Sequence, residues 1–216
     1  MRYLIALTAV LLALSGFAQR ASAATSTGFS GYYVTGSTYT STTADWTMPG
    51  FTCGAKGNGT AISIWTGLDG ITSPTVEQIG ATVQCSGGTA DYYGWYDLYP
   101  AAPVDFASTL SPGDKLDASV TYDGSSRFTL TLDDVTAGWD KTVTGTLSGA
   151  DRSSAETGVE APDTLACTPT RTLASFTGDT VDGTALGSLD PTLASGGDPH
   201  IVVSAVSGET FKVTCN

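Results

Sequence analysis

Apolar and polar residues alternate in short runs along much of this chain, and no window of a dozen residues has the periodicity of an amphipathic helix. Gly, Asp, Ser and Pro separate the runs. The clearest pair of runs, residues 116–122 and 128–132, flanks a turn at residues 123–126. This pattern predicts an all-β protein, either a sandwich or a barrel.

The first 23 residues have the composition of a secretion signal. Arg2 provides a positive start, residues 4–14 are apolar, and Ala21-Ser22-Ala23 forms a small-residue cleavage site. The apolar run is shorter than the roughly 20 residues that a membrane-spanning helix needs. We therefore expect a signal peptide at residues 1–23 and a secreted, extracellular single domain at residues 24–216, with almost no room for an inhibitory pro-segment.

The charge of the mature chain limits its partners. Removal of Arg2 and Arg20 leaves 9 − 2 = 7 basic residues against 21 acidic ones, a formal charge of −14. We expect no nucleic-acid or membrane partner, and a monomer. The acidity has two open explanations: it provides solubility, or it adapts the protein to low pH, where a chain with few basic groups gains little positive charge.

Four cysteines in a secreted chain predict two disulfides, for which three pairings exist. Cys53 and Cys85 flank a central stretch, whereas Cys167 and Cys215 bracket the tail, so we expect 53–85 and 167–215 pairing. The spacings match no zinc motif and His200 is the only histidine. We therefore expect no metal, no other cofactor and no cysteine nucleophile.

The central stretch, residues 61–100, carries the most aromatic side chains. We expect an apolar strand ending in Trp65, a turn at residues 67–70, a return through residues 76–80, and an aromatic strand at residues 92–99. Alternation would place Tyr93, Trp95, Asp97 and Tyr99 on one face and Tyr92, Tyr96 and Leu98 on the other. Rings on both faces fit a sandwich strand or a ligand-binding surface.

The rest of the chain gives weaker signals. Residues 28–46 suggest two edge-like strands, and residues 141–147 a further strand. Residues 167–198 are weakly patterned. Residues 200–206 and 210–215 predict a last hairpin.

Glutamate is rare, with four residues among the 21 acidic ones. Glu156, Gly158 and Glu160 would share one strand face, so at least one carboxylate could point into a groove, although an isolated Glu on a strand is typically a solvated surface residue. Glu77 adjoins Gln78, a polar amide within an apolar strand.

Five segments between residues 46 and 162 follow a familiar order. They are Trp65-Thr66-Gly67-Leu68-Asp69-Gly70, Val76-Glu77-Gln78-Ile79-Gly80, Gly94-Trp95-Tyr96-Asp97-Leu98-Tyr99-Pro100, Ser111-Pro112-Gly113-Asp114, and Ser154-Ala155-Glu156 followed by Val159-Glu160-Ala161-Pro162. The first, third, fourth and fifth resemble the motifs W-V-G-I/L-D-G, A-W-Y-E-W/M-Y-P, S/P-G-D and S-A-E-W-I-V-E-x-P of the glutamic peptidases, also called eqolisins or the G1 family. The second resembles the segment that carries the catalytic glutamine of that family. The family's bulky W-I pair is Thr157-Gly158 here.

The resemblance implies a fold and a site. The fold would be a sandwich of two large antiparallel sheets, of concanavalin-like or jelly-roll type, with the active site on a concave face. Gln78 and Glu156 match the family's catalytic positions. The supporting positions, as cleft wall and hydrogen-bond partners, fall on Trp65, Asp69, Asp97 and Tyr99.

These residue types suit peptide hydrolysis in acid. Glu156 would take a proton from water, while the Gln78 amide positions that water and then donates to the oxyanion. A free Glu titrates near ~4.3, whereas a His near ~6.5 would be protonated in acid. The resemblance thus implies a pepstatin-insensitive acid endopeptidase that acts on polypeptides.

Two other interpretations remain open. A sandwich-fold glycoside hydrolase would use two carboxylates ~5–9 Å apart, drawn from Glu77, Glu156 and Glu160. A secreted carbohydrate-binding module would use the aromatic face without chemistry. Ser/His/Asp catalysis through His200 lacks a G-x-S-x-G or comparable nucleophile context.

Overall fold

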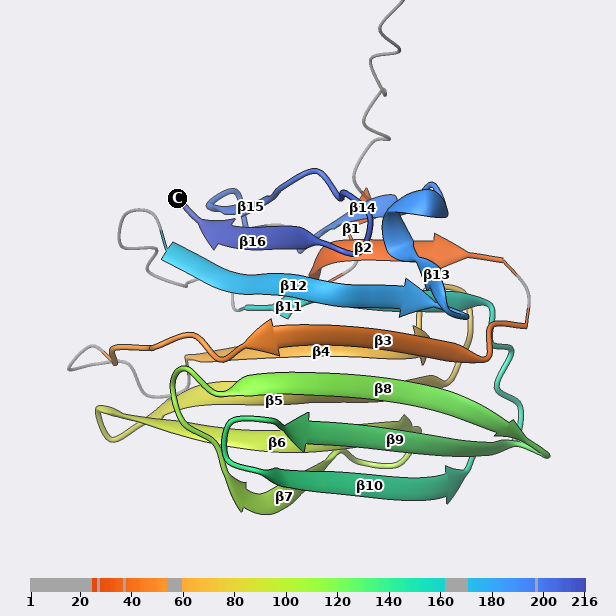
Figure 1. Ribbon diagram of the computed structural model, residues 1–216, viewed down its shortest axis with the longest axis horizontal. Helices are drawn as coiled ribbons and strands as arrows, with labels where there is room; N and C mark the ends of the chain where they lie inside the picture. The colour runs from red at the N-terminus through yellow and green to blue at the C-terminus, as the bar shows by residue number, and fades with distance from the viewer. Residues whose placement is uncertain (1–24, 27, 37, 54–59, 162–170, 197) are drawn as a thin grey trace, which may run out of the picture.

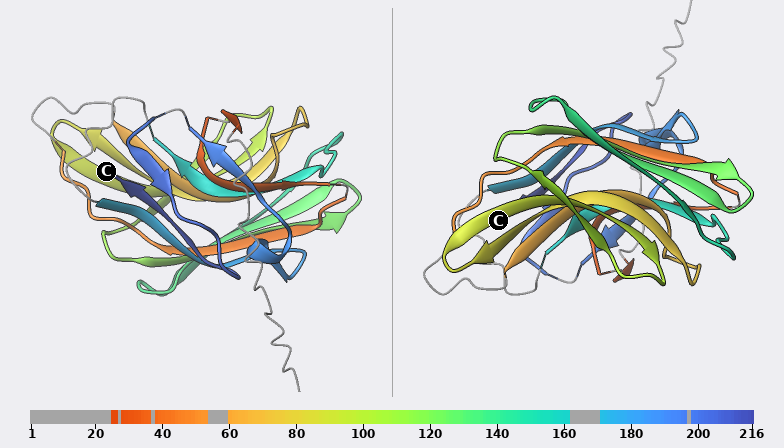
Figure 2. Two further views of the ribbon diagram at one scale, coloured as in Figure 1. Left: turned by 90° about the horizontal axis from the view of Figure 1, so that it is seen from above. Right: turned by 90° about the horizontal axis from the view of Figure 1, so that it is seen from below.

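Two curved β-sheets stack face to face in the computed structural model of the protein (Figures 1 and 2). The structure describes residues 25–216 apart from 27, 37, 54–59, 162–170 and 197. The predicted signal peptide lies outside the described residues and stays a prediction. Within the described part of the chain, no helix is long and apolar enough to cross a membrane.

The first sheet, called sheet I, contains eight strands. In spatial order they are β1 (Thr25–Ser26), β14 (Thr192–Ser195), β2 (Ser30–Thr35), β11 (Ser154–Glu160), β4 (Ala61–Asp69), β5 (Val76–Ser86), β6 (Thr89–Tyr99) and β7 (Val104–Thr109). Neighbouring strands are antiparallel except for β1 and β14. Figure 2 shows that the strands of sheet I bend so that its outer face is hollow.

The second sheet, sheet II, covers the inner face of sheet I. Its strands, in order, are β10 (Trp139–Thr146), β9 (Arg127–Asp134), β8 (Lys115–Gly124), β3 (Ser41–Thr47), β12 (Arg171–Val181), β16 (Phe211–Cys215) and β15 (Ile201–Val203), with β13 (Thr184–Ala185) paired to β12. A 3₁₀ turn, η1 (Leu186–Ser188), follows β13. The expected fold class, a sandwich of two large antiparallel sheets, is confirmed.

Alternation along the strands builds the core between the sheets. On β8 and β9 the inward residues Leu116, Val120, Leu130 and Leu132 are fully buried, and their neighbours face solvent or lie half-buried. The predicted hairpin is therefore confirmed, as is the last hairpin formed by β15 and β16.

One expectation about the strands is wrong. The two strands within residues 28–46 are not at edges, because β2 lies between β14 and β11 while β3 lies between β8 and β12 in the other sheet. Their partners are distant in sequence, so local pattern cannot reveal them. The weakly patterned tail contains β12, an eleven-residue strand, whose alternation is interrupted by two register shifts.

The turn expected at residues 67–70 begins later. β4 continues to Asp69, with Gly67 paired to Gln78 and Leu68 paired to Glu77 on β5. Leu68 is fully buried in the core. Gly67 thus serves strand packing rather than a turn, and the chain reverses only from Gly70 onward.

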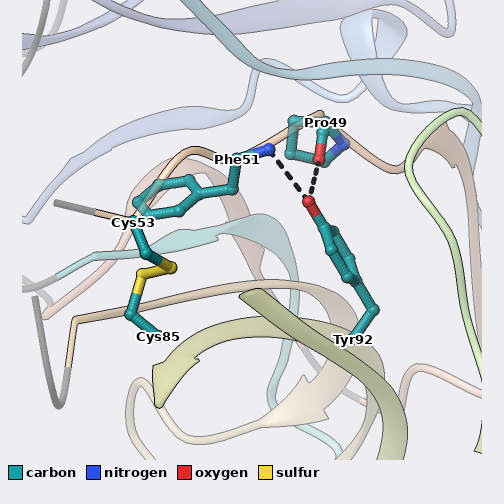
Figure 3. The surroundings of a disulfide bond; sticks show 5 residues. All are labelled: Pro49, Phe51, Cys53, Cys85 and Tyr92. Atoms are coloured by element: carbon teal, nitrogen blue, oxygen red, sulfur yellow. Dashed lines mark hydrogen bonds between the residues drawn. A yellow bond between two sulfur atoms is a disulfide. The ribbon is translucent and has the colours of Figure 1, made fainter. Parts of the chain in front are cut away.

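One predicted disulfide is confirmed, between Cys53 and Cys85, with the two Cα atoms 5.7 Å apart (Figure 3). Beside it the Tyr92 hydroxyl accepts a hydrogen bond from the Phe51 amide at 2.9 Å and donates to the Pro49 carbonyl at 3.3 Å. These bonds tie the chain between β3 and β4 to β6. Cys167 lies outside the described residues, so its pairing with Cys215 stays a prediction.

Candidate active site

A row of four residues crosses sheet I in register, each opposite the next on the adjacent strand. Glu156 on β11 faces Gly67 on β4, Gly67 faces Gln78 on β5, and Gln78 faces Asp97 on β6. The row lies on the outer, hollow face of sheet I, because the chain neighbours Leu68, Ala155 and Ile79 are in the core. We call these residues the central row.

The gap between Glu156 and Gln78 depends on Gly67. The two flanking residues are two strand spacings apart, about 9–10 Å between Cα atoms. A Cβ atom on Gly67 would lie 2.5 Å from Cγ of Gln78 and 2.8 Å from the Glu77 carbonyl oxygen. Only glycine therefore lets the carboxyl of Glu156 and the amide of Gln78 face a common space.

Gly67→Ala is expected to lower the kcat/KM of the peptide hydrolysis that the motif resemblance implies by about 100-fold, because a displacement of about 1 Å at a reacting group can cost that much. Kinetics with a peptide substrate would measure this loss. Gly50→Ala is the matched control, since a Cβ atom there meets only Pro112, at 4.0 Å. Equal activity of the two variants would contradict the role given to Gly67.

Glu156 is almost completely buried, at 2% exposure. Neither carboxylate oxygen has a hydrogen-bond partner among the described residues. Burial raises the pKa of Glu156 well above its usual range, the Ser154 hydroxyl lowers it, and the charges of Asp69 and Glu77 raise it further. The carboxyl therefore favours its protonated form, and both oxygens remain able to accept hydrogen bonds from a bound molecule.

Asp69 anchors the segment that leads into β11. Its carboxylate accepts hydrogen bonds from the Arg152 and Ser153 amides, both at 2.8 Å, and from the hydroxyls of Ser153 at 3.3 Å and Thr75 at 3.2 Å. Asp69 is fully buried. Because Ser153 lies three residues before Glu156, this cluster fixes where β11 begins and hence where the Glu156 side chain emerges.

Trp65 forms the floor beside the central row. It lies in register between Gly158 and Gly80, and its ring meets Phe29 edge-on with centroids 5.0 Å apart. A side chain at Gly158 would collide with the Phe29 ring. Phe29 thus fills the space that a side chain at Gly158 would occupy. Thr157, the other residue that replaces the bulky W-I pair of the family, points the opposite way, into the core.

The expected division of the aromatic strand is confirmed. Tyr92, Tyr96 and Leu98 pack against the core. The opposite face lines the groove, where Asp97 has a pKa raised by burial, Tyr99 is half exposed, and the Trp95 ring N–H donates to the Thr82 hydroxyl at 2.9 Å.

Two adjoining pockets open on this face. The first, of about 220 Å³, is lined by Phe29, Trp65, Asp69, Gly70, Ile71, Val76, Gln78, Asp97, Tyr99, Glu156 and Glu160. The second, of about 240 Å³, is lined by Ser63, Gln78, Thr82, Tyr93, Trp95, Asp97, Pro103, Asp105 and Glu160. Gln78, Asp97 and Glu160 belong to both, so the pockets form one groove.

The structure thus brings together all six predicted site residues, Trp65, Asp69, Gln78, Asp97, Tyr99 and Glu156, in the first pocket. Sequence reasoning missed Phe29, which reaches the groove because β2 pairs with β11. Ile71 was also missed. Within the described part of the chain, no group of three His, Cys, Asp or Glu side chains could hold a metal ion.

The alternative carboxylate pairs fit poorly. Glu77 faces the core, is fully buried, and has a pKa raised to about 8, chiefly by burial. Glu160 lies four residues from Glu156 on the same strand, about 13 Å along it, beyond the ~5–9.5 Å that a glycosidase pair needs. His200 lines neither pocket; its exposed ring lies 3.2 Å from the Asn216 carbonyl oxygen.

The fold and groove together define a β-sandwich protein whose concave face presents a Glu and a Gln on either side of a glycine. The chain belongs to the peptidase A4 family, which it matches over residues 27–189. The resemblance to glutamic peptidases that the motifs indicated is therefore confirmed.

Two curated relatives are similar in sequence. Aspergillopepsin-2 of Aspergillus niger is 29% identical over 143 residues, 57% of this chain and 50% of the relative. Scytalidopepsin B of Scytalidium lignicola is 33% identical over 110 residues, 50% of this chain and 40% of the relative. The chain thus spans about half the length of these relatives, or less.

Solved structures match over more of the chain. Scytalido-glutamic peptidase with a peptide-based transition-state analogue superposes with a TM-score of 0.69 at 24% identity, covering 87% of this chain and 98% of that one. Aspergilloglutamic peptidase from Aspergillus niger has a TM-score of 0.57 at 27% identity, covering 72% and 99%. The former likeness establishes the fold alone.

Proposed function

We propose that this protein is an acid endopeptidase in which Glu156 and Gln78 act together on a water molecule. The observation that carries the proposal is the central row, where Gly67 leaves the buried carboxyl and the amide facing one space. Membership of the peptidase A4 family supports it. We further propose that the protein acts outside the cell, as a monomer, on polypeptides.

The chemistry follows from the two side chains. Glu156 as carboxylate accepts a proton from the water, which attacks the peptide carbonyl, while the Gln78 amide donates to the oxyanion. The protonated Glu156 then transfers its proton to the leaving amine.

The ionisation of Glu156 depends on what fills the groove. Burial raises the pKa of this carboxyl, which favours the acid form. A hydrogen bond from a water molecule in the groove stabilises the carboxylate and lowers the pKa again. Gln78 has two functions: it positions this water before attack and donates to the oxyanion after it.

Hydrolysis of denatured protein at internal bonds is expected between pH 2 and pH 7, with no inhibition by pepstatin or by a chelator. Incubation across this range, with products identified by mass spectrometry, tests the proposal. Polysaccharides serve as control substrates for the glycosidase interpretation. Activity that peaks above pH 7, that a chelator abolishes, or that acts on glycans instead would refute it.

A further inference from the structure

The residue after Glu156 connects the groove to the other sheet. Because side chains alternate on β11, Thr157 points into the space between the sheets, where it is 2% exposed. Its hydroxyl lies 3.0 Å from the Thr66 hydroxyl and 3.2 Å from a carboxyl oxygen of Asp179. The Thr66 hydroxyl donates to the main-chain carbonyl of Glu156 at 3.0 Å. Hydrogen bonds therefore lead from Asp179 to the backbone of Glu156.

Asp179 reaches the core through an irregularity in β12, which lies in front of β11 in Figure 1. The pairing of β12 with β3 shifts register between Thr177 and Thr180, and Gly178 has a φ of +59°. A side chain at Gly178 would collide with Asp45. Such bulges redirect a side chain, and this one turns Asp179 inward.

The buried carboxyl of Asp179 destabilises the fold, which suggests that it has a function. It is fully buried, and its second oxygen has no hydrogen-bond partner among the described residues. A buried polar group without full pairing destabilises a fold. Among the described residues, the hydrogen-bond partner of this carboxyl is Thr157, the group that leads to Glu156.

The number of hydrogen-bond donors along this connection requires Asp179 to be neutral. Each hydroxyl has one proton to donate. Thr66 donates to the Glu156 carbonyl, so its oxygen accepts from Thr157 and from Thr42, whose hydroxyl is 2.9 Å away. Thr157 can donate to Thr66 only if Asp179 donates to Thr157. An ionised Asp179 would instead accept a hydrogen bond from the Thr157 hydroxyl. The Thr157 oxygen would then compete with the Glu156 carbonyl as acceptor for the hydrogen bond that Thr66 donates.

The surroundings favour this neutral state in acid. Burial raises the pKa of Asp179 to about 8, the Thr157 hydroxyl lowers it, and the nearby carboxyls of Asp45 and Glu209 raise it. The carboxyl is therefore protonated throughout the acid range in which the groove is expected to work.

We propose that Asp179 is a positioning residue, which as a neutral acid acts through Thr157 and Thr66 to hold the main chain of Glu156 in place. This inference rests on the proposed function of Glu156. According to this proposal, a residue of sheet II sets the position of the reacting carboxyl, although the strands of sheet II contribute no residue to the groove.

Thr157→Val tests the proposal, because valine keeps the shape of threonine but removes the hydroxyl. We expect kcat to fall about 10- to 100-fold with KM nearly unchanged. Thr42→Val is the matched control: it also removes one buried hydroxyl bonded to Thr66, but lies outside the connection from Asp179 to Glu156. It should lose as much thermal stability and keep its kcat. Thr157→Ser, which retains the hydroxyl, should restore kcat.

Two variants of Asp179 provide the second test. Asp179→Leu should reproduce the kcat loss of Thr157→Val, whereas Asp179→Asn, whose amide can donate to Thr157, should recover most of it. If Thr157→Val loses no more kcat than Thr42→Val, or if Asn rescues no better than Leu, the proposal is wrong. Wild-type cleavage and its loss in Glu156→Gln are measured first, so a failure of the proposed function would be recognised separately.

Discussion

Glu156→Gln is expected to reduce peptide hydrolysis to background while the fold and peptide binding survive. Glutamine keeps the size and hydrogen-bonding reach of glutamate but cannot accept a proton from water. The change also removes a buried ionisable group, so the variant should be at least as stable as the wild type at neutral pH. Cleavage kinetics, circular dichroism and titration with an uncleaved peptide would measure the three properties.

Gln78→Ala tests the other half of the pair. It keeps the base and removes an oxyanion donor, a loss that typically costs about 10²–10³ in rate. Because both groups act on one water molecule, the double variant should be no slower than Glu156→Gln alone. Additive losses would indicate that the two side chains act in separate steps.

Glu77→Gln and Glu160→Gln are the internal controls, and both should keep most of the activity. Glu77 faces the core, and Glu160 lies farther along the groove. If Glu160→Gln proved as damaging as Glu156→Gln, a two-carboxylate mechanism would be the better account.

The parts of the fold that local alternation encodes were predictable. β8 and β9 alternate up to an irregularity beside the short turn that joins them, and β6 divides its rings between core and groove. The candidate site could also be predicted, because Gln78 and Glu156 lie in motifs whose order along the chain is preserved. Their shared row could not, since the pairing of β11 with β4 joins residues about 90 positions apart.

The failures have physical causes. β12 escaped detection because its bulges break the alternation that marks a strand. Gly67 suggested a turn, whereas its lack of a side chain serves the space between Glu156 and Gln78. Asp179 gave no signal, since an Asp in a Thr- and Gly-rich segment is typical of a loop. In each case a residue that serves the site departs from the simplest pattern for its element.

The buried carboxyls of Glu77 and Asp179 should make the stability of the protein depend on pH. Burial is the main cause that raises the pKa of Glu77 from 4.5 and of Asp179 from 3.8, each to about 8. A carboxyl whose pKa is higher in the folded than in the unfolded protein stabilises the fold fully below its ordinary pKa, near 4. This stabilisation is lost as the pH rises through about 8.

The outer face of sheet II adds to the effect. Asp45, Asp117, Asp133 and Asp140 stand opposite one another on four adjacent strands. Like charges in directly opposed positions destabilise a sheet. Burial, Asp117 and Glu209 together raise the pKa of Asp45 to about 6, so Asp45 becomes charged at a lower pH than Glu77 and Asp179.

We therefore expect the free energy of unfolding to fall steeply between pH 4 and pH 8. One pKa unit corresponds to about 1.4 kcal/mol, so Glu77 and Asp179 would contribute roughly 3–5 kcal/mol each, a large part of the 5–15 kcal/mol that stabilises a typical domain. The midpoint of thermal unfolding should fall by about 10–30 °C. Circular dichroism at pH 4, 6 and 8 would measure it.

Variants that cannot ionise should remove much of this dependence. Glu77→Gln combined with Asp179→Asn should lose less stability between pH 4 and pH 8 than the wild type, because Glu156 and Asp45 are the raised-pKa groups left to contribute most. Asp91→Asn, at an exposed position of β6, should behave as the wild type. A wild-type protein equally stable at pH 4 and pH 8 would show that the buried carboxyls are not held protonated. An equally steep loss in the double variant would instead assign the dependence to Glu156 and to the aspartate row of sheet II.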